Sequence, residues 1–309
     1  MDANTTPDRQ TGFRTLAVPE GRFLAENGPL QARLDGDVLR LGLRLEEAHA
    51  NAGGITHGGM LMTFADTQLC LGAMFRLGEF GHLATINLTV DFVRPGVTGG
   101  WLEGETMIVR ATRNMVFVET ILTVDGETAL RASAVLWRGG DQTFDPAALF
   151  SEGDLSRLGR KGEAAPPAGY REVAIPGPFL INNGPLYGEI EGDTLRIGLR
   201  IEERHCNSAG VCHGGLAMML ADLQTSAGTM FRTGNFQFMP TIHFSCDLVA
   251  AVRLGDWLYG ETNVIRQTRN LSFAECLLYV DDSPVMRASD ISKISNKAFD
   301  LFTPETIFV

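Results

Sequence analysis

Residues 57–76, HGGMLMTFADTQLCLGAMFR, are written a second time in the chain, at 213–232, as HGGLAMMLADLQTSAGTMFR. The His, both leading Gly residues, the Asp, the Gln and the final Met-Phe-Arg are retained in both copies, whereas most of the apolar residues differ. Apolar residues can be exchanged for one another at little cost as long as the volume is kept. Retained polar residues beside changing apolar ones therefore indicate positions with a specific task.

The similarity extends far beyond this segment. With a constant offset of 156 and no gap, residues 23–133 align with residues 179–289, and 53 of these 111 positions are identical. Two repeats of this size predict two similar domains and not a solenoid, whose repeats are about 20 to 50 residues long. We expect a first domain at 1–140, a linker at 141–169 that is rich in Gly, Pro and charge, and a second domain at 170–309.

Within each repeat the pattern predicts one helix among several strands. Leu61, Ala65 and Leu69 fall on one stripe of a helix over 58–75, and further apolar residues cover its other faces. Alternating segments rich in Val, Ile, Thr and Phe predict strands within 37–46, 85–93, 105–113, 117–125 and 129–137. A helix that is apolar on most sides must be enclosed. The expected fold is therefore α+β, with two tandem domains that each wrap a curved antiparallel sheet around one long central helix.

Composition narrows the class of partner. The formal net charge is −11, which argues against nucleic acid, whose phosphates need a basic surface. No apolar stretch reaches the length of a membrane span, and the polar N-terminus lacks the apolar core of a signal peptide. The five Cys residues have irregular spacing without a zinc motif. We therefore expect a cytoplasmic protein with reduced thiols, no membrane contact and no metal.

The retained Gly and Asp residues are the main candidates for a catalytic role. A helix begins at Gly58 in one repeat and at Gly214 in the other, and the first N–H groups of a helix are unpaired and partly positive. Such an N–H, with no side chain to block it, can donate to an anion or to a carbonyl that becomes one. The glycines can also simply form a tight turn. Asp66 and Asp222 lie in the middle of an apolar helix, where a carboxylate is costly unless it is hydrogen-bonded or used.

Helix geometry separates the two groups within one repeat. At 1.5 Å per residue, Asp66 lies about 12 Å along the axis from Gly58. A reacting carbonyl must lie within about 3 Å of both its donor and its base. Two antiparallel helices satisfy this requirement, because Gly58 then meets Asp222 and Gly214 meets Asp66. The sequence thus predicts two composite sites, each with one half from each repeat.

Other polar residues are retained as pairs whose roles the sequence leaves open. They are Asn51 and Asn207, His57 and His213, Gln68 and Gln224, Thr85 and Thr241, and Arg113 and Arg269. The amide of the Asn can orient a carbonyl or water, or make a turn contact only. No Ser or Cys nucleophile is shared near the His, so loop structure or substrate polarisation is favoured over base chemistry. The Arg can contact a phosphate, although solvated charge at a strand end is the favoured interpretation.

An Asn, then HGG opening a helix, then Asp nine residues after the His resembles the hotdog-fold acyl-CoA thioesterases of the phenylacetate-degradation (PaaI-like) type. The resemblance covers about 110 residues of each repeat. It implies that the Asp acts as general base or nucleophile, that the N–H of the first Gly polarises the thioester carbonyl, and that the Asn positions water or thioester with the His beside it. More weakly, it implies that Thr85 and Thr241 supply a hydroxyl. If the substrate is an acyl-CoA, Arg113 and Arg269 are weak candidates for contact with the CoA phosphates.

The leading hypothesis is therefore hydrolysis of an acyl-CoA to a free acid and CoA, with CoA as part of the substrate and no separate cofactor. A non-catalytic acyl-CoA sensor is the alternative from another class, and its case is weakened by the Asp in both repeats. An enoyl-CoA hydratase-like enzyme is a further alternative, but the HGG…D pattern does not resemble that group. The resemblance also implies a homodimer of tandem chains, with four hotdog domains.

Overall fold

The computed structural model of the 309-residue chain describes residues 10–18, 21–143, 146–147, 165–174, 177–299 and 303–309. Its two long helices are α2 (Gly58–Leu77) and α4 (Gly214–Thr233), close to the predicted bounds. Each helix begins after a His whose Nδ1 accepts the N–H of the second Gly. Each ends at a Gly with positive φ, Gly78 and Gly234, which halts the helix without a Cβ clash.

Apart from short helices, the remaining regular structure of the described residues is antiparallel strand, with seven strands in each repeat. In the first repeat these are β1 (Arg14–Thr15), β2 (Gln31–Asp35), β3 (Val38–Arg44), β4 (Gly81–Phe92), β5 (Trp101–Ala111), β6 (Met115–Val124) and β7 (Glu127–Thr143). In the second they are β8 (Arg171–Glu172), β9 (Tyr187–Glu191), β10 (Thr194–Arg200), β11 (Thr241–Leu248), β12 (Trp257–Gln267), β13 (Leu271–Val280) and β14 (Ser283–Lys293). The five predicted strands correspond to β3 through β7, while the short β1 and β2 were not predicted.

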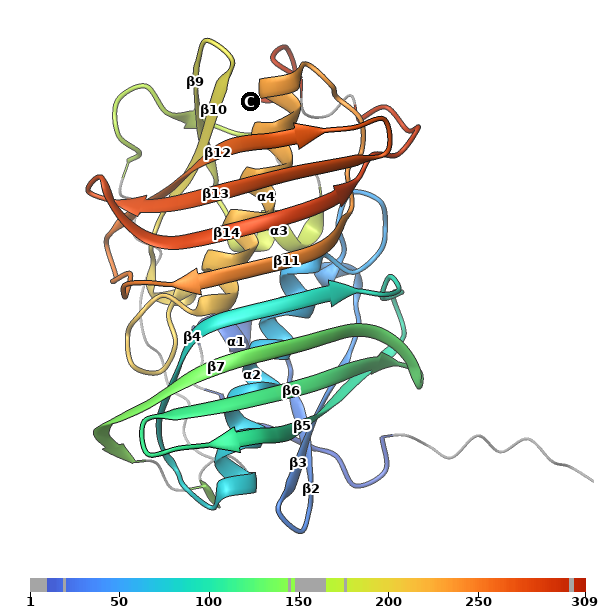
Figure 1. Ribbon diagram of the computed structural model, residues 1–309, viewed down its shortest axis with the longest axis vertical. Coiled ribbons are helices and arrows are strands. Elements are labelled where there is room, and N and C mark those ends of the chain that lie inside the picture. Colours follow the sequence, from blue (N-terminus) through green and yellow to red (C-terminus); the bar gives the residue numbers. More distant parts are fainter. Residues whose placement is uncertain (1–9, 19–20, 144–145, 148–164, 175–176, 300–302) are drawn as a thin grey trace, which may run out of the picture.

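The strands of both repeats form one continuous sheet. Its order is β1-β2-β3-β5-β6-β7-β4-β11-β14-β13-β12-β10-β9-β8, so β4 and β11 join the two halves (Figure 1). At this seam Thr89 Oγ1 lies 3.1 Å from Ser245 Oγ. The two residues occupy equivalent positions in the repeats, and their contact places an approximate two-fold axis between the halves.

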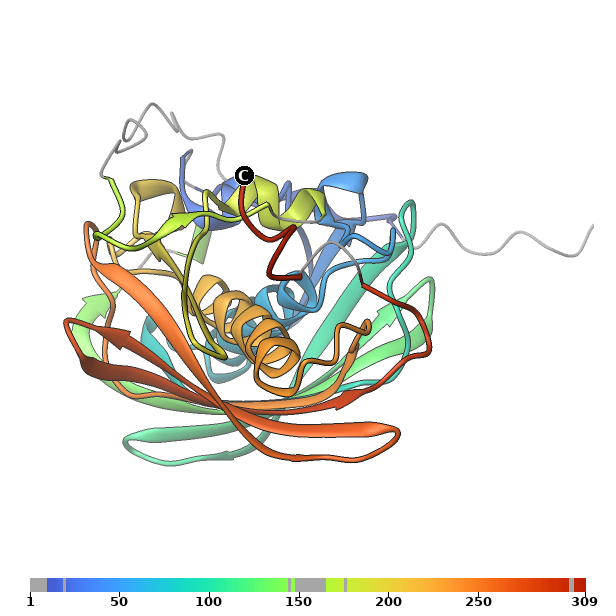
Figure 2. The same ribbon diagram turned by 90° about the horizontal axis from the view of Figure 1, so that it is seen from above.

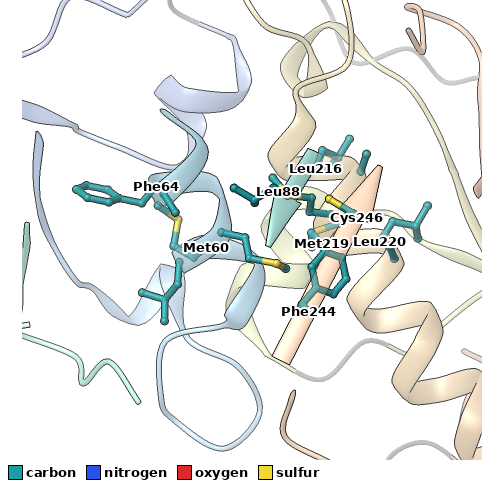
Figure 3. Packing of buried hydrophobic residues seen from close by; sticks show 14 of the residues in the cluster. Met60, Phe64, Leu88, Leu216, Met219, Leu220, Phe244 and Cys246 are labelled. Atoms are coloured by element: carbon teal, nitrogen blue, oxygen red, sulfur yellow. The ribbon is translucent and has the colours of Figure 1, made fainter. Parts of the chain in front are cut away.

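The two helices lie in the concave side of the sheet and cross each other antiparallel (Figure 2). A Cβ on Gly59 would lie 2.9 Å from Cβ of Met219, and one on Gly215 would lie 2.3 Å from Oγ1 of Thr63. The N-terminal turn of each helix therefore touches the first half of the other. Figure 3 shows Met219 beside Met60 in the apolar core that spans both repeats. The second Gly of each pair is needed for this close approach.

Two short helices, α1 (Phe23–Glu26) and α3 (Pro178–Asn183), cover the side of α2 and α4 that faces away from the sheet (Figure 2). They meet at the same two-fold axis. Asn27 Nδ2 donates to Asn183 Oδ1 over 3.0 Å, and Asn183 Nδ2 donates back to Asn27 Oδ1 over 2.9 Å. This buried reciprocal pair and the sheet seam connect the repeats on opposite sides of the helices.

The domain limits stay a prediction. β7 continues to Thr143, three residues past the expected end of the first domain at 140. Most of the expected linker, 141–169, lies outside the described residues.

Candidate active site

Two cavities lie where the N-terminus of one long helix meets the middle of the other. The first has a volume of about 520 Å³. Asn51, His57 and Gly58 of the first repeat line it together with Asp222 and Thr241 of the second. We name it the Gly58–Asp222 site.

The second cavity, of about 540 Å³, is the counterpart of the first. It is lined by Asn207, His213 and Gly214 of the second repeat and by Asp66 and Thr85 of the first. We name it the Gly214–Asp66 site. The five residue pairs expected at the sites are thus brought together as two groups, and each group draws on both repeats.

The distance between the first Gly and the Asp agrees with the crossed arrangement. A Cβ on Gly58 would lie 3.5 Å from Oδ2 of Asp222, and one on Gly214 would lie 3.4 Å from Oδ2 of Asp66. Within one helix the same two residue types stand eight positions apart. A small group held between the Gly and the Asp therefore touches two different helices.

The N–H groups of Gly58 and Gly214 are available to a ligand. Each is the first N–H of its helix, and among the described residues no hydrogen bond to either one is found. The N–H of the following Gly donates to the ring of the His. The N–H groups of the two residues after that Gly donate to the carbonyl oxygen of the same His. An unpaired N–H at a helix N-terminus favours an oxygen with negative charge.

Both carboxylates are buried and held by a hydroxyl. Thr85 Oγ1 donates to Asp66 Oδ1 over 2.6 Å, and Thr241 Oγ1 donates to Asp222 Oδ1 over 2.7 Å. Burial raises the pKa of Asp222 to about 6, with the Thr241 hydroxyl opposing the rise. Burial also raises the pKa of Asp66, while the nearby His213 and the Thr85 hydroxyl lower it. A base with its pKa moved toward neutrality is suited to accept a proton from water.

The two histidines are buried helix caps. His57 Nδ1 accepts the Gly59 N–H over 2.9 Å, so in the neutral ring the proton is on Nε2. Burial lowers the pKa of His57 to about 4, and it also lowers the pKa of His213, where the nearby Asp66 opposes the change. Both rings are therefore neutral at physiological pH. They shape the helix entry and line the cavities.

The asparagines make the turn contact that the sequence left open as one of two roles. Asn51 Oδ1 accepts the N–H groups of Gly53 and Ile55, which closes the loop before α2. Asn207 makes the corresponding contacts in the second repeat. In both cases the oxygen is used within the loop while the residue lines a cavity, so the amide nitrogen is the group that can face a ligand.

The retained glutamines, in contrast, are structural. Gln68 is fully buried, and its Oε1 accepts the N–H of Leu41 over 2.7 Å while its Nε2 donates to the carbonyl of Leu39 over 3.0 Å. Gln224 repeats these bonds to β10. Each glutamine connects the long helix to a strand, which explains why both copies retain it.

Charged residues that the sequence interpretation missed line both cavities. Arg22, which is ion-paired with Glu203, lines the Gly214–Asp66 cavity. Arg94 and Lys293 line the Gly58–Asp222 cavity, whereas Arg113 and Arg269 are exposed at strand ends and line neither cavity. Arg94 follows β4 and Lys293 ends β14, 199 residues later in the chain. Their equivalents in the other repeat are uncharged, which is a signal that the alignment of the repeats could have shown.

Some general features are also defined by the described part of the chain. No group of three or more His, Cys, Asp or Glu side chains within it is arranged to hold a metal ion. No helix among these residues has both the length and the apolar character to cross a membrane.

Two solved structures share this architecture. The acyl-CoA thioesterase II of Mycobacterium marinum superposes with a TM-score of 0.60 at 10% identity, covering 88% of this chain and 98% of that one. A hot dog fold protein of unknown function from Alicyclobacillus acidocaldarius superposes with a TM-score of 0.61 at 15% identity, covering 89% and 98%. At these identities the likeness shows the fold, which confirms the expected pair of tandem hotdog domains.

Sequence relatives define the family. A curated protein of Pseudomonas aeruginosa, named as an esterase candidate, is 32% identical over 126 residues, which is 40% of this chain and 94% of that protein. It therefore corresponds in length to one repeat. The thioesterase superfamily matches residues 53–129 and, independently, residues 209–286. The chain belongs to the thioesterase superfamily, and it carries two hotdog domains in one polypeptide.

Proposed function

We propose that the protein is an acyl-CoA thioesterase with two composite sites, each formed by the HGG loop of one repeat and the helix Asp of the other. The observation that carries the proposal is the unpaired N–H of Gly58 beside the buried carboxylate of Asp222, with the same pair repeated at Gly214 and Asp66. An oxyanion donor and a base on opposite sides of one small space are what acyl transfer to water needs.

In the Gly58–Asp222 site the thioester carbonyl oxygen accepts the Gly58 N–H, which makes the carbonyl carbon more electrophilic. A water molecule, oriented with help from the Asn51 amide, attacks that carbon and gives a proton to Asp222. The C–S bond then breaks, and the sulfur leaves as the thiol with this proton. Alternatively, the carboxylate attacks the carbonyl first, and water hydrolyses the resulting anhydride. Both routes use the same residues and need no metal ligand.

The identity of the leaving group is supported by charge and shape. Arg94 and Lys293 bring positive charge to a cavity whose other lining residues include Phe92, Phe238 and Met239. An apolar pocket with two cations suits an acyl chain attached to a phosphorylated carrier. The related Mycobacterium marinum enzyme is named as an acyl-CoA thioesterase, which agrees with CoA as this carrier.

The test is release of free CoA thiol from a series of acyl-CoAs, comparing the wild type with Asp66→Asn, Asp222→Asn and the double variant. Asn keeps the volume of the side chain but accepts no proton. Each single variant is expected to retain about half of the activity, and the double variant to lose about 100-fold or more. Asp37→Asn, at an exposed position outside both cavities, is the matched control.

A non-catalytic sensor makes a different prediction in the same experiment. It would bind acyl-CoA but release no thiol from any member of the series, and the Asp variants would change binding only. That outcome would replace the hydrolase with an acyl-CoA-binding protein.

We also infer a homodimer of tandem chains, with four hotdog domains. The outer face of the sheet carries exposed apolar residues from both repeats, among them Met107, Ile121 and Ile265. Apolar side chains on an open sheet face favour burial against another protein surface. Light scattering coupled to size-exclusion chromatography gives the mass directly, and a mass of one chain would contradict this inference.

A further inference from the structure

Asp290, on β14, is a buried carboxyl group to which hydrolysis as described above assigns no role. The side chain lies on the sheet face that packs against α4, and only 3% of the residue is exposed. Its Oδ1 accepts the hydroxyl of Ser292 over 2.6 Å, but its Oδ2 has no hydrogen-bond partner among the described residues. A buried carboxyl oxygen without a donor is costly in the ionised form.

The first repeat has no such group. The equivalent of Asp290 is Ala134, and neighbouring polar positions between α4 and the sheet are also apolar in the first repeat. Ser272, Ser292, Thr225 and Thr229 of the second repeat stand where the first repeat has, in the same order, Val116, Leu136, Leu69 and Ala73. All eight side chains lie between the long helix and the sheet and are almost completely buried. The second repeat therefore encloses a polar layer at the place where the first has a purely apolar core.

This polar layer adjoins the Gly58–Asp222 site. Burial raises the pKa of Asp290 to about 7, and the negative charge of Asp222 is the next largest cause of the rise. The hydroxyls of Ser292 and Thr241 act in the opposite direction. Thr241 is also the residue that donates to Asp222 over 2.7 Å. Thr241 lies opposite Ser292 in the pairing of β11 with β14, and Ser292 donates to Asp290. The two carboxyl groups are therefore connected through neighbouring hydroxyl-bearing residues.

We propose that Asp290 is a positioning residue that shares a proton with Asp222, so that the Gly58–Asp222 site takes up its inactivating proton at a higher pH than the Gly214–Asp66 site does. Two buried carboxyl groups that interact cannot both ionise freely, and their protons belong to the pair. The proposal rests on the proposed function, because it concerns the base of that reaction.

The other titratable groups around Asp290 do not compensate its charge. Cys246 on β11 and Cys276 on β13 lie on the same sheet face, and burial raises the pKa of both thiols, which therefore stay neutral. Lys293, at the end of β14, is exposed. From α4, Asp222 is the titratable group that faces Asp290. The carboxyl pair therefore holds its proton without a neighbouring buried cation.

The activity test isolates one site at a time. In an Asp66→Asn background, only the Gly58–Asp222 site can turn over, and its rate is expected to fall as the pH drops through the range where the pair is protonated. Asp290→Asn removes one titrating carboxyl, so the midpoint of this acid limb should move to lower pH by about half a unit or more. In an Asp222→Asn background, the same substitution should leave the acid limb of the Gly214–Asp66 site unchanged.

A midpoint that Asp290→Asn does not move, or that it moves equally in both backgrounds, would overturn the proposal. A merely structural role would lower the rate at every pH without shifting the midpoint. If Asp290→Asn fails to fold, Asp290→Ala serves instead, because it installs the residue that the first repeat carries at this place.

A second measurement needs neither activity nor a change at position 290. Carbon-13 NMR of aspartate-labelled protein follows the Asp290 carboxyl in the wild type and in Asp222→Asn. Removing the Asp222 charge should lower the Asp290 midpoint, and an unchanged midpoint would contradict the shared proton. If no acyl-CoA is hydrolysed by any variant, the thioesterase assignment fails, while this titration still decides whether the two carboxyl groups are coupled.

Discussion

The two composite sites share their central groups but differ in the residues around them. At the centre of each are a helix-terminal Gly N–H, an Asp held by a Thr hydroxyl, a capping His and a loop Asn. Around the Gly58–Asp222 site lie Arg94, Lys293 and a second buried carboxyl, whereas Arg22 is the arginine that lines the other cavity. At the other site, the position of Arg94 is taken by Ala250 and that of Asp290 by Ala134.

The difference separates what the reaction requires from what a particular substrate or pH requires. The retained groups lie where the helix terminus and the carboxylate face each other, and their positions follow from the two-fold crossing of the helices. The changed groups lie at the rim of the cavity or behind the carboxylate. We infer that both sites carry out the same chemical step, with different affinity for a charged carrier and different response to pH.

The largest expected effect comes from testing which Gly and which Asp belong to the same site. Gly58→Pro removes the donor N–H, and proline is tolerated at the first position of a helix, where His57 already has the extended backbone that a following proline requires. Combined with Asp222→Asn, it damages one site twice and should leave about half of the activity. Gly214→Pro combined with Asp222→Asn damages both sites and should reduce thiol release about 100-fold or more.

Equal activity of these two double variants would contradict sites composed across the repeats. Circular dichroism and a cooperative thermal transition for each variant establish that the proline has not unfolded the helix.

The next effect separates the two glycines of each pair. Gly59→Ala brings a methyl group within 2.9 Å of Met219 Cβ and should lower the free energy of unfolding by about 1–3 kcal/mol. At Gly58 the nearest atoms to a Cβ are at 3.4 Å, an ordinary contact, so Gly58→Ala should change stability by less than about 0.5 kcal/mol. Urea denaturation of both variants measures this difference. Similar losses for both would show that Gly58 is also a packing residue.

A smaller effect tests the charges that belong to one site. In the Asp66→Asn background, Arg94→Ala and Lys293→Ala should each raise the KM for acyl-CoA by about tenfold or less, because each removes one charged contact to phosphate. A pantetheine thioester, which lacks the nucleotide phosphates, should be unaffected. In the Asp222→Asn background the same substitutions should leave KM unchanged, and an increase there would remove the distinction between the two cavity rims.

The smallest effect is expected at Arg113 and Arg269. Both are exposed and outside the cavities, so Arg113→Ala and Arg269→Ala should change KM for acyl-CoA by less than about twofold. A larger increase would mean that a bound CoA extends along the strand ends.

Much of the arrangement of the central Gly and Asp residues in the two sites could be predicted from the sequence. The offset of 156 made the retained polar residues visible, and the rise of a helix excluded Gly58 and Asp66 from one site. Both predictions depend on local geometry and on symmetry. Arg94 and Lys293 could not be placed in this way, because they approach one cavity only through the pairing of β11 with β4 on one side and with β14 on the other. The role of Gln68 was equally hidden, since it depends on its contact with β3.

The continuous sheet has an evolutionary consequence. In a dimer of identical subunits, every substitution appears in both active sites, so neither site can change without the other. In the tandem chain β4 and β11 pair across the two repeats, but each repeat has its own coding sequence. A carboxylate such as Asp290, or a pair of cations at one rim, can then arise on one side alone. A tandem repeat thus allows one of two similar sites to change while the other stays as it is.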